Sequence, residues 1–244
     1  MTEQHATVVL PAMSAGQAAS WHGLMDVYER LPRGWTLVGG QLVHLHCAER
    51  GQSPERPTDD IDAVVDVRAN PDLLADFTRV LIDLGFTAKT SAEGLQHRWL
   101  RGQAQIDVLL PDGVGRRAAA RMGVGGGPTL PTPGGTQSLD RTEPVRVVVD
   151  GRTGTVLRPN LVGALVMKAA AHTVAADSGR GRHRLDFVTL AGLIARSDFR
   201  ETRLSTKDRT RLRNMLRACR ADPIAMEPRQ AAEGLRRLEQ AAGL

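Results

Sequence analysis

The residues with the clearest chemical potential are two glycines and two aspartates. Gly39 and Gly40 follow a short apolar run, while Asp60 and Asp62 stand one residue apart at the start of another. Side chains on a strand alternate between its two faces, so the two aspartates would point to the same side. Two carboxylates held side by side repel each other unless a cation lies between them. The pattern predicts a divalent-metal site for nucleoside triphosphate chemistry.

A third carboxylate completes this pattern. Asp107 lies in the second strand of a predicted hairpin, where Ile106 and Val108 face the other way. Nucleotidyl transfer uses such a carboxylate to position the attacking group and to share the metals. We therefore predict a cluster of Asp60, Asp62 and Asp107 that binds two divalent ions, Mg²⁺ or Mn²⁺, which bridge the triphosphate and the incoming hydroxyl.

The glycine pair would let the backbone approach the phosphates and would aim a helix N-terminus at them. Gly39 and Gly40 are therefore candidate nucleotide-binding residues, and Thr58, which precedes the aspartates, is another. Asp59 adds a further acid beside the aspartate pair, and whether it shares the metal is left open.

Lys168 lies in the middle of an apolar helical segment. A buried ammonium is costly unless an anion lies beside it, and a triphosphate or Asp186 would supply that anion. The alternative is a lysine on the solvated face of the helix, and spacing alone favours neither.

The apolar periodicity and the turn signals predict the remaining elements. The predicted strands cover residues 35–38, 60–67, 96–100, 103–110, 145–149 and 155–157, with another strand starting at Phe86. The predicted helices cover residues 20–31 (capped by Ser20), 39–49, 70–85, 161–176 (capped by Asn160), 185–195, 206–219 and 228–242. Residues 113–144 are rich in Gly, Pro, Thr and Ser, and we expect a long mobile loop there without fixed elements. Residues 178–184 are predicted to form a basic turn.

This order predicts an α/β (α+β) fold, with a mixed sheet and flanking helices followed by an α-helical C-terminal region. We expect a catalytic domain over residues 1–157, including the flexible loop 113–144, and a basic helical domain over residues 158–244. At 244 residues and 41% hydrophobic composition, the chain is long enough for a substantial core.

The net charge of +5 is unevenly distributed. Residues 53–113 carry eleven acidic and six basic side chains, whereas residues 196–220 carry nine basic and three acidic ones. The first part should hold cations and the second should attract polyanions. Because aromatic residues make up only 3% of the chain, RNA would be bound through its phosphates. The candidate RNA-binding residues, for which a solvated helix face is the alternative, are Arg209, Arg211, Arg213, Arg217 and Arg220.

No stretch has the length of a signal peptide core or a membrane span, so we expect a cytoplasmic protein without a membrane partner. Cys47 and Cys219 are far apart and lack metal-ligand spacing, which predicts reduced thiols. His44 and His46 are two positions apart on a helix and face different directions, so they are predicted to be ordinary helix side chains.

The sequence resembles the AbiEii-type nucleotidyltransferases, which include the MenT toxins. The resemblance covers about residues 35–193 and rests on motifs that occur in the same order. The motifs are Val38-Gly-Gly40, Arg56-Pro-Thr-Asp-Asp-Ile-Asp62, Gln105-Ile-Asp-Val-Leu-Leu110, Val156-Leu-Arg-Pro-Asn-Leu-Val-Gly-Ala-Leu-Val-Met-Lys168 and Arg182-His-Arg-Leu-Asp186.

The resemblance implies the nucleotidyltransferase fold, dependence on Mg²⁺ and, as in the characterised toxins, transfer of nucleotides to the 3′ end of tRNA. It makes Asp60 and Asp62 metal ligands, Lys168 the triphosphate contact and Asp186 the acidic residue of a basic-then-Asp helix motif. The base that precedes this aspartate is displaced by one residue here, so Arg182, His183 and Arg184 compete for its nucleotide-binding role.

Three functions therefore compete. The first is a toxin of a toxin–antitoxin pair that transfers a nucleotide from an NTP to tRNA or another RNA, with a cognate antitoxin protein as a further partner. The second is a nucleotidyltransferase that modifies a small molecule such as an antibiotic. The third is a catalytically silent binding module that retains the fold.

Overall fold

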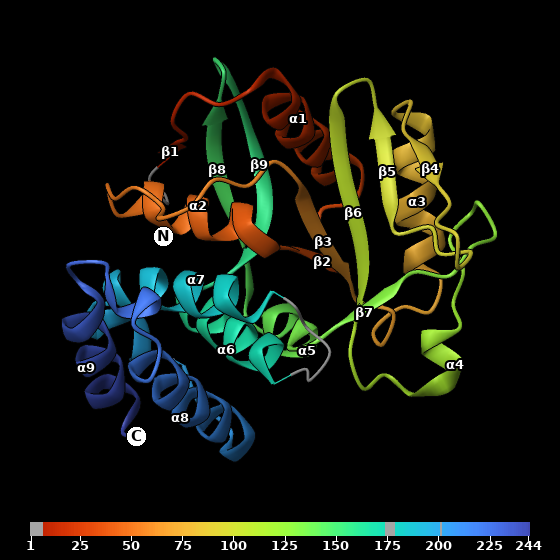
Figure 1. The fold of residues 1–244 in the computed structure, drawn as a ribbon. Helices are drawn as coiled ribbons and strands as arrows, with labels where there is room; N and C mark the ends of the chain where they lie inside the picture. Colours follow the sequence, from red (N-terminus) through yellow and green to blue (C-terminus); the bar gives the residue numbers. More distant parts are fainter. Residues whose placement is uncertain (1–6, 174–178, 201) are drawn as a thin grey trace.

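The computed structural model describes residues 7–173, 179–200 and 202–244 of the chain. It confirms the predicted α/β class, because strands and helices alternate in the first part and helices alone form the C-terminal region (Figure 1). The strands divide between two sheets. One continuous apolar core, which includes Trp21, Leu165 and Leu238, runs through both parts. The division into domains at residue 157 stays a prediction.

The larger sheet brings the predicted aspartates together. β3 is antiparallel to β2 and parallel to β6, and its register pairs Asp62 with Val38 on one side and with Asp107 on the other. The carboxylates therefore meet beside the glycine turn that follows β2. The strand order is β2 (Trp35–Val38), β3 (Ile61–Val65), β6 (Ala104–Pro111), β5 (Arg98–Arg101) and β4 (Thr87–Lys89), and β7 (Leu130–Thr132) pairs with β6.

The smaller sheet has the order β1 (Val8–Val9), β8 (Thr142–Val149) and β9 (Arg152–Pro159). As predicted, β8 and β9 form a hairpin around Asp150 and Gly151. Both turn residues have positive φ, 46° and 77°, as tight two-residue hairpin turns require. β9 lies beside β2, which joins the two sheets.

The helices cover the sheets and form the C-terminal region, where α6 to α9 gather on one side of the sheets (Figure 1). None of the described helices is long and apolar enough to cross a membrane. The helices are α1 (Ala15–Arg30), α2 (Gly39–Glu49), α3 (Leu73–Asp83), α4 (Gly115–Ala119), α5 (Gly135–Leu139), α6 (Leu161–His172), α7 (Arg180–Gly192), α8 (Thr206–Arg220) and α9 (Ala231–Ala242), with 3₁₀ turns at Arg196–Phe199 and Ile224–Met226.

Helix α1 begins five residues before the predicted start. Ser14 is its cap: the Ser14 hydroxyl accepts from the backbone N–H of Gln17 at 3.2 Å, and the Gln17 side chain accepts from the N–H of Ser14 at 2.8 Å. Ser20, predicted as the cap, lies inside the helix. Its hydroxyl donates to the carbonyl of Gly16 at 2.8 Å and accepts from the N–H of Gln105 at 2.9 Å, which ties α1 to β6.

The expectation that residues 113–144 lack fixed elements is wrong, because this segment contains α4, β7 and α5. Tertiary contacts determine its structure. The buried hydroxyl of Thr129 donates to the carbonyl of Val108, and β7 extends the pairing along β6. Gly135 packs so closely on Pro111 that an added Cβ would lie 2.9 Å from the Pro111 Cα, so the glycine here serves packing.

The turn predicted over residues 178–184 is largely helical, because α7 begins at Arg180. The predicted cap of α6 is confirmed: the side chain of Asn160 accepts from the N–H of Gly163 at 2.9 Å. Part of that turn and the predicted end of α6 fall on residues 174–178, which lie outside the described residues. Helix α3 begins at Leu73, three residues after the predicted start.

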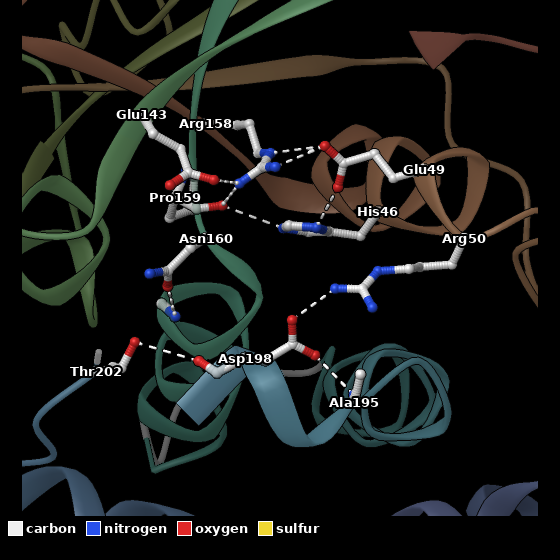
Figure 2. Close-up of polar contacts among 11 residues, drawn as sticks. His46, Glu49, Arg50, Glu143, Arg158, Pro159, Asn160, Ala195, Asp198 and Thr202 are labelled. Atoms are coloured by element: carbon white, nitrogen blue, oxygen red, sulfur yellow. Dashed lines mark hydrogen bonds and ion pairs between the residues drawn. The ribbon is translucent and has the colours of Figure 1, made fainter. Parts of the chain in front are cut away.

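A buried polar cluster anchors the C-terminal end of α2 (Figure 2). The guanidinium of Arg158, on β9, donates to Glu49 at 3.1 and 2.6 Å and to Glu143 at 2.5 Å. The imidazole of His46 lies between Glu49, at 2.9 Å, and the carbonyl of Pro159, at 3.2 Å. Burial alone would raise the pKa of Glu49, but the hydrogen bond from His46 and the charge of Arg158 lower it to about 2.

Replacing Glu49 should therefore destabilise the protein more than replacing Glu143. Glu49→Gln leaves Arg158 and His46 buried without their main anion, which should lower the free energy of unfolding by about 3 kcal/mol. Glu143→Gln is the control: the side chain of Glu143 is 39% exposed, so its loss should cost less than about 1 kcal/mol. Urea unfolding at pH 7 measures both values, and equal losses would contradict this account.

Candidate active site

The two glycines at the start of α2 make room for two side chains of the site. Gly39 has a φ of +75°, and a Cβ there would lie 1.9 Å from the Asp62 Oδ2. At Gly40 a Cβ would lie 2.6 Å from the hydroxyl oxygen of Thr58. The preceding residue, Val38, provides no side-chain cap for the helix. The glycines are thus required by close packing, and the approach of phosphates to this helix end stays a prediction.

Asp60, Asp62 and Asp107 form the predicted cluster. Each offers a carboxylate oxygen, and these three oxygens lie within 4.8 Å of one another. The Thr58 hydroxyl donates to Asp60 at 2.9 Å and so fixes its orientation. Asp59 is exposed and lies outside this cluster.

The charges of the cluster show what would fit between the carboxylates. Burial raises the pKa of Asp62 to about 7, together with the negative charges of Asp60 and Asp107, while Lys168 and Arg98 act in the opposite direction. A cation among the oxygens would relieve this repulsion. Because the donors are all carboxylate oxygens, they suit a hard divalent ion such as Mg²⁺ or Mn²⁺.

Arg98 supports the third aspartate and was not among the predicted site residues. Its Nε and Nη2 donate to the two oxygens of Asp107 at 3.0 and 2.9 Å. The hairpin register makes the two residues direct partners across β5 and β6. The predicted hairpin turned at Arg101 and Gly102, which would pair Arg98 with Gln105. The observed turn lies one residue later, at Gly102 and Gln103, and this register brings Arg98 beside Asp107.

Lys168 is buried, with 2% of its surface exposed, which excludes the solvated-face alternative. Its Nζ donates to Asp186 at 2.6 Å and to the carbonyl of Gly39 at 2.9 Å. Asp186, equally buried, also accepts two hydrogen bonds from Arg56, at 2.8 and 2.9 Å. Burial would raise the pKa of Asp186, but the charge of Lys168 and the hydrogen bond from Arg56 lower it.

A cavity of about 470 Å³ opens beside Asp60. Of the arginines on α7 that were candidates for nucleotide binding, Arg182 lines this cavity, whereas Arg184 donates to Asp222 instead. Arg56 is a second cation in the lining, and sequence analysis assigned it no role. The lining residues are Ser14, Gly16, Gln17, Arg56, Pro57, Thr58, Asp59, Asp60, Gln103, Gln105 and Arg182.

The arginines of α8 do not form one open surface. Arg211 is buried, and Arg209 donates to the carbonyl of Ala242. Arg220 forms an ion pair with Glu239 at 2.6 Å. The remaining two predicted RNA-binding residues, Arg213 and Arg217, are exposed and one helical turn apart.

Comparison with solved structures identifies the fold. An antigenic nucleotidyltransferase-like protein from Paracoccidioides brasiliensis matches 92% of this chain over 94% of its own length, with a TM-score of 0.51 and 14% identity. The antibiotic-resistance factor ANT(2'')-Ia, known from its solution structure, matches 86% of this chain over 95% of its own, with a TM-score of 0.41 and 14% identity. No protein-family model and no curated protein sequence matches the chain. The fold is nucleotidyltransferase-like, as predicted, and membership of the AbiEii-type family stays a prediction.

Replacing Gly39 with alanine should displace Asp62 from the cluster, because the new methyl group would overlap its carboxylate. Gly51→Ala is the matched control, since Gly51 also has a positive φ, +61°, but nothing lies within 4 Å of its Cβ position. Both variants should carry the backbone strain, on the order of 1 kcal/mol. Only Gly39→Ala should also weaken Mn²⁺ binding in calorimetry, by at least about tenfold. Equal Mn²⁺ affinity in the two variants would remove Gly39 from this role.

The raised pKa of Asp62 predicts a pH dependence of metal binding. Below a pH of about 7 the carboxyl carries a proton that the metal must displace, so Mg²⁺ affinity should fall as the pH decreases, by up to about tenfold per pH unit. Without metal, the protein should lose stability as the pH rises from about 4, the usual pKa of an aspartate, to about 7. Calorimetry and thermal unfolding between pH 5 and 8 test both effects. Asp62→Asn should weaken Mg²⁺ binding at every pH and abolish the pH dependence of stability, and persistence of that dependence in the variant would assign it to another group.

Proposed function

We propose that this protein is a metal-dependent nucleotidyltransferase that transfers a nucleoside monophosphate from an NTP to a hydroxyl of RNA. The observation that carries the proposal is the cluster of Asp60, Asp62 and Asp107, whose oxygens lie within 4.8 Å beside the glycine turn of a nucleotidyltransferase-like fold. The three carboxylates would hold a divalent ion, which would neutralise charge on the triphosphate and favour ionisation of the hydroxyl.

The reaction conserves its atoms without a further reactant. The acceptor oxygen attacks the α-phosphorus and forms the new ester bond, while the bond between the α-phosphorus and the bridging oxygen breaks and pyrophosphate leaves. A carboxylate of the cluster accepts the hydroxyl proton. The chain's own groups act by position: Thr58 orients Asp60, and Arg98 orients Asp107.

An RNA acceptor, with the 3′ end of tRNA as the first candidate, is supported by the basic C-terminal region. The exposed Arg213 and Arg217 lie on one face of α8, and the whole chain carries a net charge of +5. The role of toxin in a toxin–antitoxin pair rests on the motif resemblance alone.

Modification of a small molecule is the second candidate. The cavity beside Asp60 has a volume of about 470 Å³, within the usual range for small-molecule sites. Its acidic residues, Asp59 and Asp60, would suit a cationic acceptor such as an aminoglycoside. Arg56 and Arg182 in the same lining count against this acceptor.

In the decisive experiment, the protein is incubated with Mg²⁺, with each α-³²P-labelled NTP in turn, and with either total tRNA or a panel of aminoglycosides. We expect label on tRNA, and a loss of at least about 10³-fold in Asp60→Ala and Asp62→Ala, because each removes a metal ligand. Asp66→Asn is the control, since Asp66 follows the opposite end of β3.

Label on an aminoglycoside, and none on tRNA, would establish the second candidate. Label that persists on tRNA in the double variant Asp60→Ala/Asp62→Ala would contradict the assigned site. Absence of both labelling and Mg²⁺-dependent NTP binding would favour a silent binding module.

A further inference from the structure

The buried ammonium of Lys168 is already engaged by protein groups. Its side chain is 3% exposed, and its Nζ donates to Asp186 at 2.6 Å and to the carbonyl of Gly39 at 2.9 Å. A phosphate could reach this nitrogen only by displacing one of these acceptors. Loss of Asp186 would leave a buried charge uncompensated, and loss of the Gly39 carbonyl would disturb the turn that accommodates Asp62.

Arg56 and Arg182 both line the cavity beside Asp60, whereas Lys168 is not among its lining residues. Asp186 holds the Nε and Nη2 of Arg56, while its Nη1 makes only a long contact, 3.3 Å, with the carbonyl of Pro57. Asp186 thus fixes the orientation of the Arg56 guanidinium, while the Arg56 side chain remains 22% exposed and lines the cavity.

The chemistry of this pair suits a polyphosphate. A guanidinium presents a planar fork of N–H donors that matches two phosphate oxygens and stays charged at any physiological pH. The negative charges of Asp60 and Asp62 interact with the guanidinium of Arg56, so Arg56 lies near the proposed metal ligands. The size of the cavity, about 470 Å³, suits a nucleotide better than a folded RNA.

We propose that Arg56 and Arg182 bind the triphosphate of the nucleotide, and that Lys168 and Asp186 are positioning residues that hold Arg56 and Gly39 without touching it. This inference rests on the proposed function and specifies the phosphate subsite of that site. It reassigns the triphosphate contact from Lys168 to the two arginines that line the cavity.

Arg182 and Arg184 provide a matched test, because they lie two residues apart on α7 and only Arg182 lines the cavity. Calorimetry measures the binding of inorganic triphosphate and of a non-hydrolysable NTP analogue, both with Mg²⁺. We expect Arg182→Gln to weaken both by at least about tenfold, because it loses charge-assisted hydrogen bonds, and Arg184→Gln to bind within twofold of wild type. Equal affinities in the two variants would overturn the proposal, as would a loss of RNA binding alone in Arg182→Gln.

A double-mutant cycle tests the positioning role of Lys168. If Lys168 acts through Asp186 on Arg56, then Lys168→Met should weaken binding of the NTP analogue when Arg56 is present. In an Arg56→Gln background the same substitution should lower the affinity by less than a further twofold. Equal losses in both backgrounds would mean that Lys168 does not act through Arg56 and would overturn that part of the assignment. Thermal unfolding verifies the fold of each variant, and Asp186→Asn replaces Lys168→Met if the latter does not fold.

The two proposals fail differently. If wild-type protein binds no Mg²⁺–NTP, the proposed function fails. If the wild type binds the NTP analogue, the Asp60→Ala/Asp62→Ala variant does not, and the Arg182→Gln variant binds it with unchanged affinity, then only the assignment of the phosphate subsite is wrong.

Discussion

The repulsion among three neighbouring carboxylates is the constraint on which the rest of this structure depends. Burial and this repulsion together raise the pKa of Asp62 to about 7, so the ionised cluster needs compensating positive charge nearby. Arg98 supplies part of that charge, and its Nε and Nη2 both donate hydrogen bonds to Asp107. Lys168 supplies another part and is bound to Asp186. Each cation is thus fixed by its own acid, and the three aspartates keep carboxylate oxygens within 4.8 Å of one another.

The same constraint extends to the backbone through α2. Asp62 occupies the space where Gly39 would carry a Cβ, so the helix must begin with a glycine in the left-handed region. Lys168 holds the carbonyl of this glycine, while Arg158 holds Glu49 at the last residue of the helix. An eleven-residue helix is therefore anchored at both ends by buried cations, and its N-terminus lies beside the aspartate cluster without a side-chain cap.

The features that depend on local sequence patterns could be predicted from the sequence, whereas those determined by contacts between distant residues could not. The glycine turn, the Asp60–Asp62 alternation and the hairpin of Asp107 follow from the periodicity of strands and turns. Residues 113–144 were misjudged because a hydroxyl bond to β6 and the packing of a glycine on Pro111 order them, and composition shows neither. Arg56 was missed because its partner lies 130 residues away.

The arginines of α8 show why a count of charges overestimates a binding surface. Arg211 is buried, Arg209 closes the C-terminal end of α9 by binding the Ala242 carbonyl, and Arg220 pairs with Glu239. These side chains stabilise the helical region and offer little to a polyanion: Glu239 neutralises Arg220, a backbone carbonyl occupies a donor of Arg209, and Arg211 is buried. A phosphate backbone would find open charge at Arg213 and Arg217. If the proposed transfer to RNA holds, specificity for the acceptor would have to arise nearer the cavity, where the geometry of the site rather than net charge would distinguish one hydroxyl from another.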